Sequence, residues 1–279
     1  MNIYMILIVE NIAKELKQYH AVDLESYESR FLLKKIKCRM ADLGITVPGK
    51  YLTYFQENPD EARILIREIG ISVSLFFRNP FVYSIIEQQL LPSIIEAKRQ
   101  NGSSEIRVWS AGCATGEEPY SIAILLHRLL EKEIINWKIH IFATDIGQKR
   151  LTTAAAGVFH RDKLVDTKLE NADKYFSQSQ GNYRLKPEIR KMVNFSLDDL
   201  ASTDKIAPAA SIFGSFDLVL CRNVMIYFNN SAKTRAVQKF IKTLNSSGYL
   251  ILGESEWIDD SLKSAFIEID QTNRIYKKK

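Results

Sequence analysis

The alternation of strand and helix patterns after residue 105 restricts the fold of this chain more than any other feature. Strands are predicted at residues 106–110, 139–143, 192–196, 216–221 and 249–252, helices at 117–132, 148–156 and 231–244, and a final strand pair at 266–270 and 274–277. Strands separated by helices in this way run parallel. The order therefore predicts an α/β domain with helices on the faces of a parallel sheet.

Two further parts differ from this pattern. Apolar residues recur at helical spacing before residue 70, as in Leu32, Ile36 and Met40, and strand signals are almost absent there. We expect a small all-helical domain at residues 1–75 and the α/β domain at 76–279. The polar run at 177–185 predicts a β-hairpin within an inserted β-subdomain at about residues 161–191.

Composition excludes several classes of protein. The chain has 38 Lys and Arg against 33 Asp and Glu, a net charge of +5, which is mild for a nucleic-acid-binding protein. Cys38, Cys113 and Cys221 form no CxxC motif and no neighbouring histidine accompanies them, so neither a disulfide framework nor a metal site is expected. The apolar residues 1–9 are far fewer than the ~20 of a membrane span. We expect a cytoplasmic protein that is not inserted in a membrane.

A turn of small residues follows the first predicted strand and opens a helix. Gly112 and Gly116 allow the backbone to pass close to a ligand, although any tight turn of this kind favours glycine. Glu117 and Glu118 stand at the helix start, where they would repel a pyrophosphate and favour a ligand with positive charge. Stabilisation of the helix dipole alone would select the same two acids.

Polar residues also follow two other predicted strands. Asp145 ends the second strand, where adenosine-binding α/β folds place an acid that binds ribose hydroxyls; it could equally cap the next helix. Arg222, Asn223 and Tyr227 follow the strand at 216–221 and are expected to face the crevice at its carboxyl end. Arg78, in the segment Ser-Leu-Phe-Phe-Arg, lies at the predicted domain junction.

These segments resemble one family, the CheR family of chemoreceptor glutamate methyltransferases of bacterial and archaeal chemotaxis. The resemblance covers nearly the whole chain and is most specific at residues 115–121 (TGEEPYS), 221–228 (CRNVMIYF) and 248–256 (GYLILGESE). It implies a class I S-adenosylmethionine-dependent methyltransferase domain with a Rossmann-like fold, a small N-terminal helical domain and an inserted β-subdomain. The implied reaction transfers methyl from S-adenosylmethionine to glutamate side chains on cytoplasmic helices of chemoreceptors, yielding S-adenosylhomocysteine.

The resemblance and the motifs together give the expected site residues. Arg78 and Tyr227 are expected to act in catalysis. Residues expected to bind the cofactor are Ser72, Ser74, Arg78, Gly112, Glu117, Glu118, Asp145, Asp199, Leu200, Cys221 and Arg222. The family usually has Asn and Thr where Ser72 and Ser74 stand, and Asn where Asp199 stands. Serine retains the hydroxyl of threonine, whereas Ser72 and Asp199 depart from the pattern at those contacts.

A basic stretch in the helical domain is the expected docking surface for the receptor. It contains Arg30, Lys34, Lys35, Lys37 and Arg39 within ten residues that include no acid. Arg30, Lys34 and Lys37 share a face opposite the apolar stripe, and the simplest alternative is a solvated face. The resemblance implies that the inserted β-subdomain can bind a receptor C-terminal pentapeptide in some members of the family. The polar loop at 177–184 looks shorter than in those members, so recognition independent of the pentapeptide is expected. A monomer suffices for all of these expectations.

Two other functions remain open at this point. Gly112, Gly116 and Asp145 could fit a nicotinamide-dependent oxidoreductase, although Glu117 and Glu118 disfavour the pyrophosphate. The second alternative is a non-catalytic relative that binds the cofactor or the receptor as a signalling module. The departures from the family pattern at Ser72 and Asp199 favour this alternative.

Overall fold

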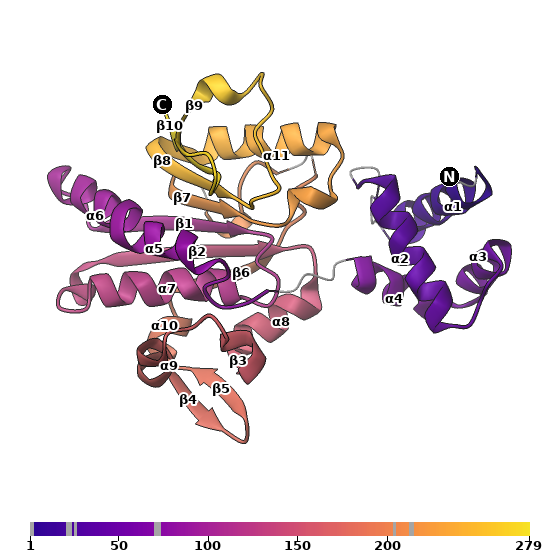
Figure 1. Cartoon of the computed structure of the whole chain (residues 1–279), viewed down its shortest axis with the longest axis horizontal. Helices are drawn as coiled ribbons and strands as arrows, with labels where there is room; N and C mark the ends of the chain where they lie inside the picture. The colour runs from indigo at the N-terminus through magenta and orange to yellow at the C-terminus, as the bar shows by residue number, and fades with distance from the viewer. Residues whose placement is uncertain (1–2, 21–23, 25–26, 70–73, 203–204, 212–214) are drawn as a thin grey trace. The chain divides into compact units, whose positions relative to one another are not determined.

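The chain divides into two compact units. The computed structural model describes residues 3–20, 24, 27–69, 74–202, 205–211 and 215–279. The helical unit comprises residues 1–72 and 227–233, and the α/β unit comprises residues 73–226 and 234–279 (Figure 1). Among the described residues, no helix has both the length and the apolar character needed to cross a membrane.

The described residues of the helical unit before residue 70 form the helices α1 (Ile3–His20), α2 (Ser29–Asp42), α3 (Pro48–Glu57) and α4 (Pro59–Ile69). Both α3 and α4 begin with proline, whose fixed φ and missing N–H suit the first helical position. The apolar stripe predicted on α2 is buried, since Leu32, Ile36 and Met40 all face the core of the unit. The predicted N-terminal helical region is therefore confirmed.

A buried ion pair joins α2 to α4. Glu61 on α4 is only 1% exposed. Its two carboxylate oxygens accept hydrogen bonds from Nε and Nη2 of Arg39, at 2.8 and 2.9 Å. The hydroxyl of Tyr51 on α3 donates to the same carboxylate at 3.0 Å. The charge of Arg39 is thus balanced inside the unit, which sets it apart from its exposed neighbours on α2.

Arg39→Met is expected to destabilise the protein by about 3–5 kcal/mol, because it leaves the Glu61 carboxylate buried without its partner. Urea denaturation followed by circular dichroism measures the loss. Arg30→Met on the same helix removes an exposed charge and is the control, expected to change stability by about 0.5 kcal/mol or less. Equal effects of the two substitutions would contradict a structural role for Arg39.

A seven-stranded sheet forms the centre of the α/β unit. Its strands are β1 (Glu105–Ala111), β2 (Lys138–Asp145), β6 (Val193–Leu197), β7 (Phe216–Cys221), β8 (Leu244–Leu252), β9 (Phe266–Asp270) and β10 (Ile275–Lys278). They lie in the order β6-β2-β1-β7-β8-β10-β9. The first five are parallel, and β10 runs antiparallel to both of its neighbours. The order reverses direction between β1 and β7, where folds of this type bind ligands.

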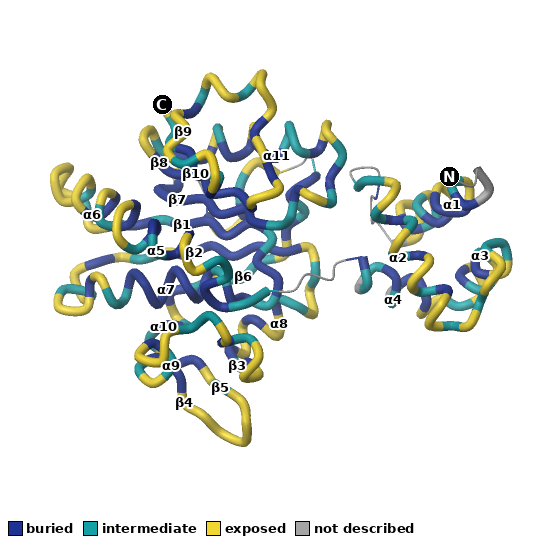
Figure 2. Tube along the Cα trace, viewed as in Figure 1, coloured by how far each residue is buried: buried dark blue, intermediate teal, exposed yellow. Residues whose placement is uncertain are grey.

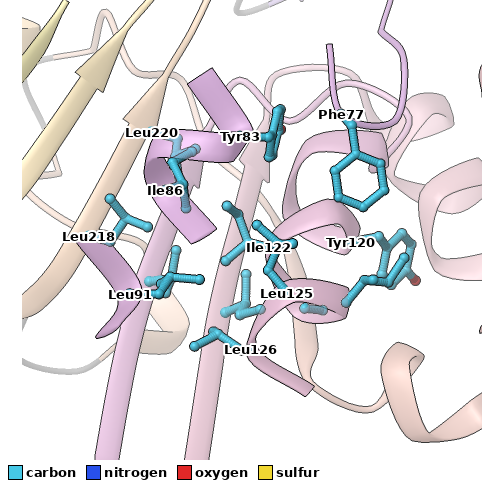
Figure 3. Packing of buried hydrophobic residues seen from close by; sticks show 14 of the residues in the cluster. Phe77, Tyr83, Ile86, Leu91, Tyr120, Ile122, Leu125, Leu126, Leu218 and Leu220 are labelled. Carbon is cyan, nitrogen blue, oxygen red and sulfur yellow. The ribbon is translucent and has the colours of Figure 1, made fainter. Parts of the chain in front are cut away.

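Helices cover both faces of the sheet. On one face, α5 (Pro80–Ile85), α6 (Leu91–Gln100) and α7 (Glu117–Leu129) pack apolar side chains against the sheet, including Leu218 and Leu220 of β7 (Figure 3). On the other face, Phe240 of α11 (Asn230–Thr243) meets Trp109 of β1, their ring centroids 5.4 Å apart. The central strands are accordingly buried along most of their length (Figure 2). The predicted α/β architecture is confirmed.

The helical stretch that begins at Pro80 and ends at Gln100 is interrupted. A π-helical turn, η1 (Ile86–Leu90), separates α5 from α6, and the N–H of Leu91 bonds to the carbonyl of Ile86. Pro92 follows directly and has no N–H to donate, so the regular pattern of helical hydrogen bonds cannot continue through it.

The inserted β-subdomain is larger than a hairpin. The predicted hairpin is present as β4 (Phe176–Ser179) and β5 (Asn182–Leu185), but β3 (Val158–His160) pairs with β5 to give the order β3-β5-β4. The turn of the hairpin is two residues, Gln180 and Gly181, with φ of 49° and 76°. Positive φ at both positions is the conformation that tight hairpins require.

Shorter elements complete the chain. They are α8 (Gln148–Ala156), α9 (Leu169–Tyr175), α10 (Pro187–Arg190), and the single turns η2 (Ile134–Asn136), η3 (Arg161–Leu164), η4 (Ala209–Ser211), η5 (Met225–Tyr227) and η6 (Lys263–Ala265).

Candidate active site

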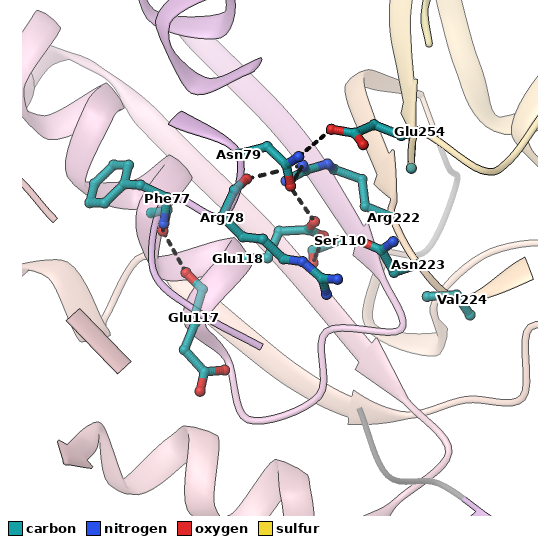
Figure 4. A network of polar contacts seen from close by, with 12 residues as sticks. Phe77, Arg78, Asn79, Ser110, Glu117, Glu118, Arg222, Asn223, Val224 and Glu254 are labelled. Atoms are coloured by element: carbon teal, nitrogen blue, oxygen red, sulfur yellow. Dashed lines mark hydrogen bonds and ion pairs between the residues drawn. The ribbon is translucent and has the colours of Figure 1, made fainter. Parts of the chain in front are cut away.

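The candidate site lies at the carboxyl edge of the parallel strands. Loops leave this edge after β1, β2, β6, β7 and β8, and they carry most of the residues predicted from the sequence. The segment 74–79 joins them through hydrogen bonds. The N–H of Phe77 donates to Ser121 Oγ on α7 at 3.0 Å, and Arg222 Nη2 donates to the carbonyl of Arg78 at 3.0 Å (Figure 4). The fold thus brings together segments that are more than 140 residues apart.

The glycines of the β1–α7 loop are required by close packing. Gly112 has φ of 78°, and a Cβ there would lie 2.4 Å from Cγ2 of Val224. Gly116 has φ of 94°, and a Cβ would lie 2.9 Å from the Cβ of Ala154 on α8. Neither position accepts a larger residue without displacement of its neighbours. Gly112 therefore lets the β7 loop close over the β1 loop.

The two acids at the start of α7 face different surroundings. Glu117 is fully buried, accepts the hydroxyl of Thr115 at 2.7 Å, and lies 3.5 Å from Nζ of Lys163. Glu118 accepts Ser110 Oγ at 2.8 Å and lies 4.0 Å from Arg222 Nη1. Glu118 lies in the same polar network as Arg78 and Arg222 (Figure 4). Of the two predicted acids, Glu118 is the better placed to meet a cationic group.

Burial raises the pKa of Glu118, and the positive charges of Arg222 and Arg78 oppose that effect. If the ionised carboxylate binds the cofactor, affinity for S-adenosylhomocysteine should fall as the pH is lowered. The fall should begin above the pH at which an ordinary glutamate, with a pKa of about 4.3, takes up its proton. Calorimetric titrations from about pH 8 to about pH 5 measure this dependence. Glu118→Gln should bind weakly throughout that range with little dependence on pH; the unchanged wild-type profile in this variant would rule Glu118 out.

Asp145 at the end of β2 holds two loops together. Its Oδ2 accepts the N–H of Ala114 at 2.9 Å, and its Oδ1 accepts the N–H of Gly147 at 2.7 Å. Arg150 Nε also donates to Oδ1 at 2.9 Å. The side chain is only 7% exposed. Asp145 thus fixes the loop before α8, but the N-cap residue of that helix is Gly147, which has no side chain to cap it, so the capping interpretation is not supported. Oδ2, which accepts the N–H of Ala114, has a second lone pair that suits a hydroxyl donor.

The loop after β6 lies beside Asp145. The N–H of Asp198 donates to the carbonyl of Asp145 at 3.1 Å. Asp199 Oδ1 accepts the N–H of Ala201 at 2.9 Å, and the side chain of Leu200 is buried. Asp199 thus stabilises its own turn within this region.

Ile146, which follows Asp145 directly, is 39% exposed. No sequence motif indicated it, although an exposed apolar residue beside Asp145 suits the face of an adenine ring.

Arg222 is buried and engaged with protein groups. Its side chain is 4% exposed, and Nη2 donates to the carbonyl of Arg78 and to Oδ1 of Asn79 at 3.0 and 3.2 Å. The guanidinium also lies over the ring of Tyr83, 5.5 Å from its centroid. The structure therefore gives Arg222 a role in placing the Arg78 segment.

Cys221, which precedes Arg222 and was also expected to bind the cofactor, has no exposed surface. Burial raises the pKa of its thiol.

The insertion contributes a lysine, Lys163, that no sequence motif indicates. Lys163 Nζ donates to the carbonyl of Ser74 at 3.0 Å, besides approaching Glu117. The carbonyl of Lys163 accepts the N–H of Phe76. Nothing in the sequence pairs residue 163 with residue 74, so only the fold reveals this contact. The predicted contact at Ser72 lies outside the described residues.

Tyr227 belongs to the helical unit. Its ring packs against Phe31 of α2 with centroids 4.6 Å apart, and its carbonyl accepts the N–H of Glu28 at 2.9 Å. A hollow of about 300 Å³ beside it is lined by Phe31, Lys34, Lys35, Cys38, Arg39, Asp42, Glu68 and Tyr227. Arg30, Lys34 and Lys37 are exposed on α2. Lys35 is half-buried, and burial lowers its pKa.

Comparison with known proteins identifies the family. Residues 72–275 match the model of the CheR methyltransferase, SAM-binding domain. The chain belongs to the CheR methyltransferase family. It is an S-adenosylmethionine-dependent methyltransferase of the class I fold, as the motifs at 115–121 and 221–228 implied. This assignment decides against the nicotinamide-dependent oxidoreductase.

Relatives from several bacteria share the greater part of the chain. The chemotaxis protein methyltransferase of Borreliella burgdorferi is 34% identical over 212 residues, covering 75% of this chain and 73% of that protein. That of Listeria innocua is 34% identical over 233 residues, covering 81% and 83%. That of Escherichia coli is 29% identical over 251 residues, covering 88% and 82%. Among solved structures, a TehB-like SAM-dependent methyltransferase of Corynebacterium glutamicum matches with a TM-score of 0.37 and 12% identity, covering 67% of this chain and 83% of that one.

The residues at the carboxyl edge fit S-adenosylmethionine. Glu118 offers a carboxylate to an ammonium group, and Asp145 offers one to the ribose hydroxyls. The glycine loop between them approaches closely enough for backbone contact. Among the described residues, no group of three or more His, Cys, Asp or Glu side chains is arranged to hold a metal ion.

Proposed function

We propose that this methyltransferase esterifies glutamate side chains on the cytoplasmic helices of chemoreceptors and so takes part in receptor adaptation. The observation that carries the proposal is the polar network of Arg78, Glu118 and Arg222 at the carboxyl edge of a CheR-family sheet. The relatives' name, chemotaxis protein methyltransferase, supports the choice of substrate. Such a substrate places the enzyme in the cytoplasm.

The chemistry requires alignment more than acid–base catalysis. Bound S-adenosylmethionine supplies an electrophilic methyl group on a sulfonium. A glutamate carboxylate, with a pKa of about 4.3, is already ionised at neutral pH and needs no base. Arg78 is proposed to orient this carboxylate, with Tyr227 as the second orienting group. Because the carboxylate loses its charge as the ester forms, too tight a grip by Arg78 would stabilise the ground state and slow the reaction.

Incubation with labelled S-adenosylmethionine and a chemoreceptor cytoplasmic fragment tests the proposal. The expected product is a base-labile methyl ester on glutamate. A non-catalytic relative would bind S-adenosylhomocysteine or the receptor fragment but leave the receptor unlabelled. Replacement of the receptor glutamates by alanine should abolish the label, and label that persists on other side chains would contradict the assigned substrate.

The exposed basic face of α2 is proposed to dock the receptor. Arg30, Lys34 and Lys37 point to solvent on this helix, while the neighbouring hollow adds Lys35 and the aromatic rings of Phe31 and Tyr227. An acidic helix would meet positive charge over this surface, which mainly increases the rate of encounter and fixes the register. Arg39 is left out of this docking surface because Glu61 already binds it.

Lys34→Glu with Lys37→Glu should slow receptor methylation at low salt by about tenfold, because reversal of two charges removes the electrostatic attraction. Binding of S-adenosylhomocysteine should not change. Lys14→Glu with Lys50→Glu reverses two exposed charges on other helices of the same unit and is the matched control. Initial rates measured across ionic strength compare the pairs; equal rates for both would exclude the basic face of α2 as the docking surface.

Recognition is proposed to be independent of a receptor C-terminal pentapeptide, with the enzyme acting as a monomer. The two-residue turn between β4 and β5 supports the first part, since it leaves the hairpin no extended loop. Titration with the pentapeptide should give no saturable binding, whereas measurable affinity would overturn this part of the proposal. Sedimentation analysis tests the monomer.

A further inference from the structure

Glu256, in the loop after β8, binds the backbone of the loop that follows β7. The side chain is 3% exposed, and its two carboxylate oxygens accept five backbone N–H groups. Oε1 accepts those of Val224, Met225 and Ile226 at 2.8, 2.6 and 3.3 Å. Oε2 accepts those of Asn223 and Gly253 at 2.9 and 2.6 Å. One carboxylate therefore fixes four consecutive residues, 223–226.

Close packing around the carboxylate leaves little room for other arrangements. A Cβ on Gly253 would lie 2.6 Å from Oε2 of Glu256 and 2.8 Å from the nitrogen of Asn223. Asn223 itself has φ of 61°, a left-handed conformation that the hydrogen bonds of Glu256 help to maintain. Glu256, Gly253 and Asn223 thus form one unit of fixed geometry.

The segment that Glu256 holds connects the main parts of the candidate site. It follows Arg222, whose guanidinium bonds to the carbonyl of Arg78 and approaches Glu118. It also contains Val224, whose side chain packs against the Cα of Gly112 in the β1–α7 loop. Figure 4 shows Asn223 and Val224 directly beyond Arg222 in this network. A shift of the segment would therefore displace Arg222, and through it the Arg78 segment.

Burial of the Glu256 carboxylate costs free energy unless hydrogen bonds stabilise its charge. Burial raises the pKa of Glu256, while the amide donors act in the opposite direction. Glu118 of α7 and Cys221 of β7 both interact electrostatically with it. Among the described residues, no basic side chain forms an ion pair with Glu256, so the five amides provide its stabilisation.

We propose that Glu256 is a positioning residue for methyl transfer, whose carboxylate fixes residues 223–226 and thereby sets the place of Arg222 and the Arg78 segment. The inference rests on the proposed function. Glutamine has the same shape but only one acceptor oxygen, so its amide group would oppose the N–H donors of Asn223 and Gly253. The segment should shift slightly without unfolding, because the substitution also removes a buried charge.

Kinetics of Glu256→Gln on the full chain test the inference. At saturating S-adenosylmethionine, kcat should fall about tenfold to a hundredfold, the effect of misplacement by roughly an ångström, with KM for the receptor fragment unchanged. Wild-type kcat should fall toward that of the variant as the pH is lowered and Glu256 takes up a proton, whereas kcat of the variant should lack this acid limb. Asp259→Asn, an exposed turn-capping acid nearby, is the control and should retain wild-type kcat.

Gly253→Ala provides a second route to the same shift. Its methyl group crowds Glu256 Oε2 and the Asn223 nitrogen, so it should also lower kcat with KM unchanged, even if Glu256→Gln failed to fold. Wild-type kcat in either folded variant would overturn the inference. A loss that follows only the folded fraction, with no change in the pH profile, would also overturn it by showing a purely structural role. An unlabelled receptor with the wild-type enzyme would instead contradict the proposed function.

Discussion

Arg78→Ala is expected to lower kcat of receptor methylation by about a hundredfold to a thousandfold, the loss typical of removing one group that acts on the reacting charge. Arg78 is the half-buried cation of the segment that Arg222 and Ser121 hold against α7. Arg222 binds the backbone carbonyl of Arg78, so the segment should keep its place when the side chain is removed. The loss should therefore appear in turnover, while S-adenosylhomocysteine binding and the fold largely persist.

Three comparisons isolate the role of the guanidinium. Arg78→Lys keeps the charge but loses the planar pair of donors, and an intermediate rate is expected. Arg99→Ala removes an arginine that pairs with Glu133 on the surface, and it should leave kcat unchanged. Tyr227→Phe should slow turnover less than Arg78→Ala, because only a hydroxyl is lost. Single-turnover measurement of ester formation gives these rates; a wild-type rate for Arg78→Ala would remove Arg78 from the catalytic proposal.

Asp145→Ala should weaken S-adenosylhomocysteine binding by about tenfold to a hundredfold, as expected for loss of hydrogen bonds to a charged group. The same substitution removes the acceptor of the Ala114 and Gly147 N–H groups and leaves Arg150 without this carboxylate. Some loss of thermal stability should accompany the weaker binding. Calorimetry with the wild-type and variant proteins at one temperature, where both are folded, separates the two effects.

Asp270→Ala is the matched control for Asp145. Asp270 likewise accepts a backbone N–H and a side-chain donor, both from Asn273, but it lies on the outermost strand β9, which β1, β7, β8 and β10 separate from β2 in the sheet. It should lower stability without affecting S-adenosylhomocysteine. If Asp145→Ala behaves in the same way, with unchanged affinity, then Asp145 serves only to join the loops that carry Ala114 and Gly147.

The fold was largely predictable because its signals are local. The buried strand β7 is apolar apart from Asp217, and the amphipathic stripe of α2 repeats at helical spacing. The interruption at Pro92 and the third strand of the insertion were missed for opposite reasons. Pro92 is a local signal of an interrupted helix, whereas β3 is three residues long and forms because β5 lies beside it.

The site was only partly predictable. Motifs name Gly112, Glu118, Asp145 and Arg78, because each belongs to a run of residues at the end of a strand or at a helix start. They do not distinguish Glu118 from Glu117, which are adjacent and identical in type. The fold makes that distinction by directing Glu117 toward Lys163 and Thr115, and Glu118 toward Ser110 and Arg222.

The sequence by itself determined the class of fold, the methyltransferase family and the edge of the sheet that carries the chemistry. These properties follow from periodicity and from short motifs, which act over a few residues. Only the tertiary structure decided that Arg222 serves the Arg78 segment, that Arg39 belongs to a buried ion pair, and that Glu256 holds the β7 loop. Each of these roles depends on hydrogen bonds between residues 22 to 144 positions apart, whose meeting is set by the packing of the whole unit and by no local pattern.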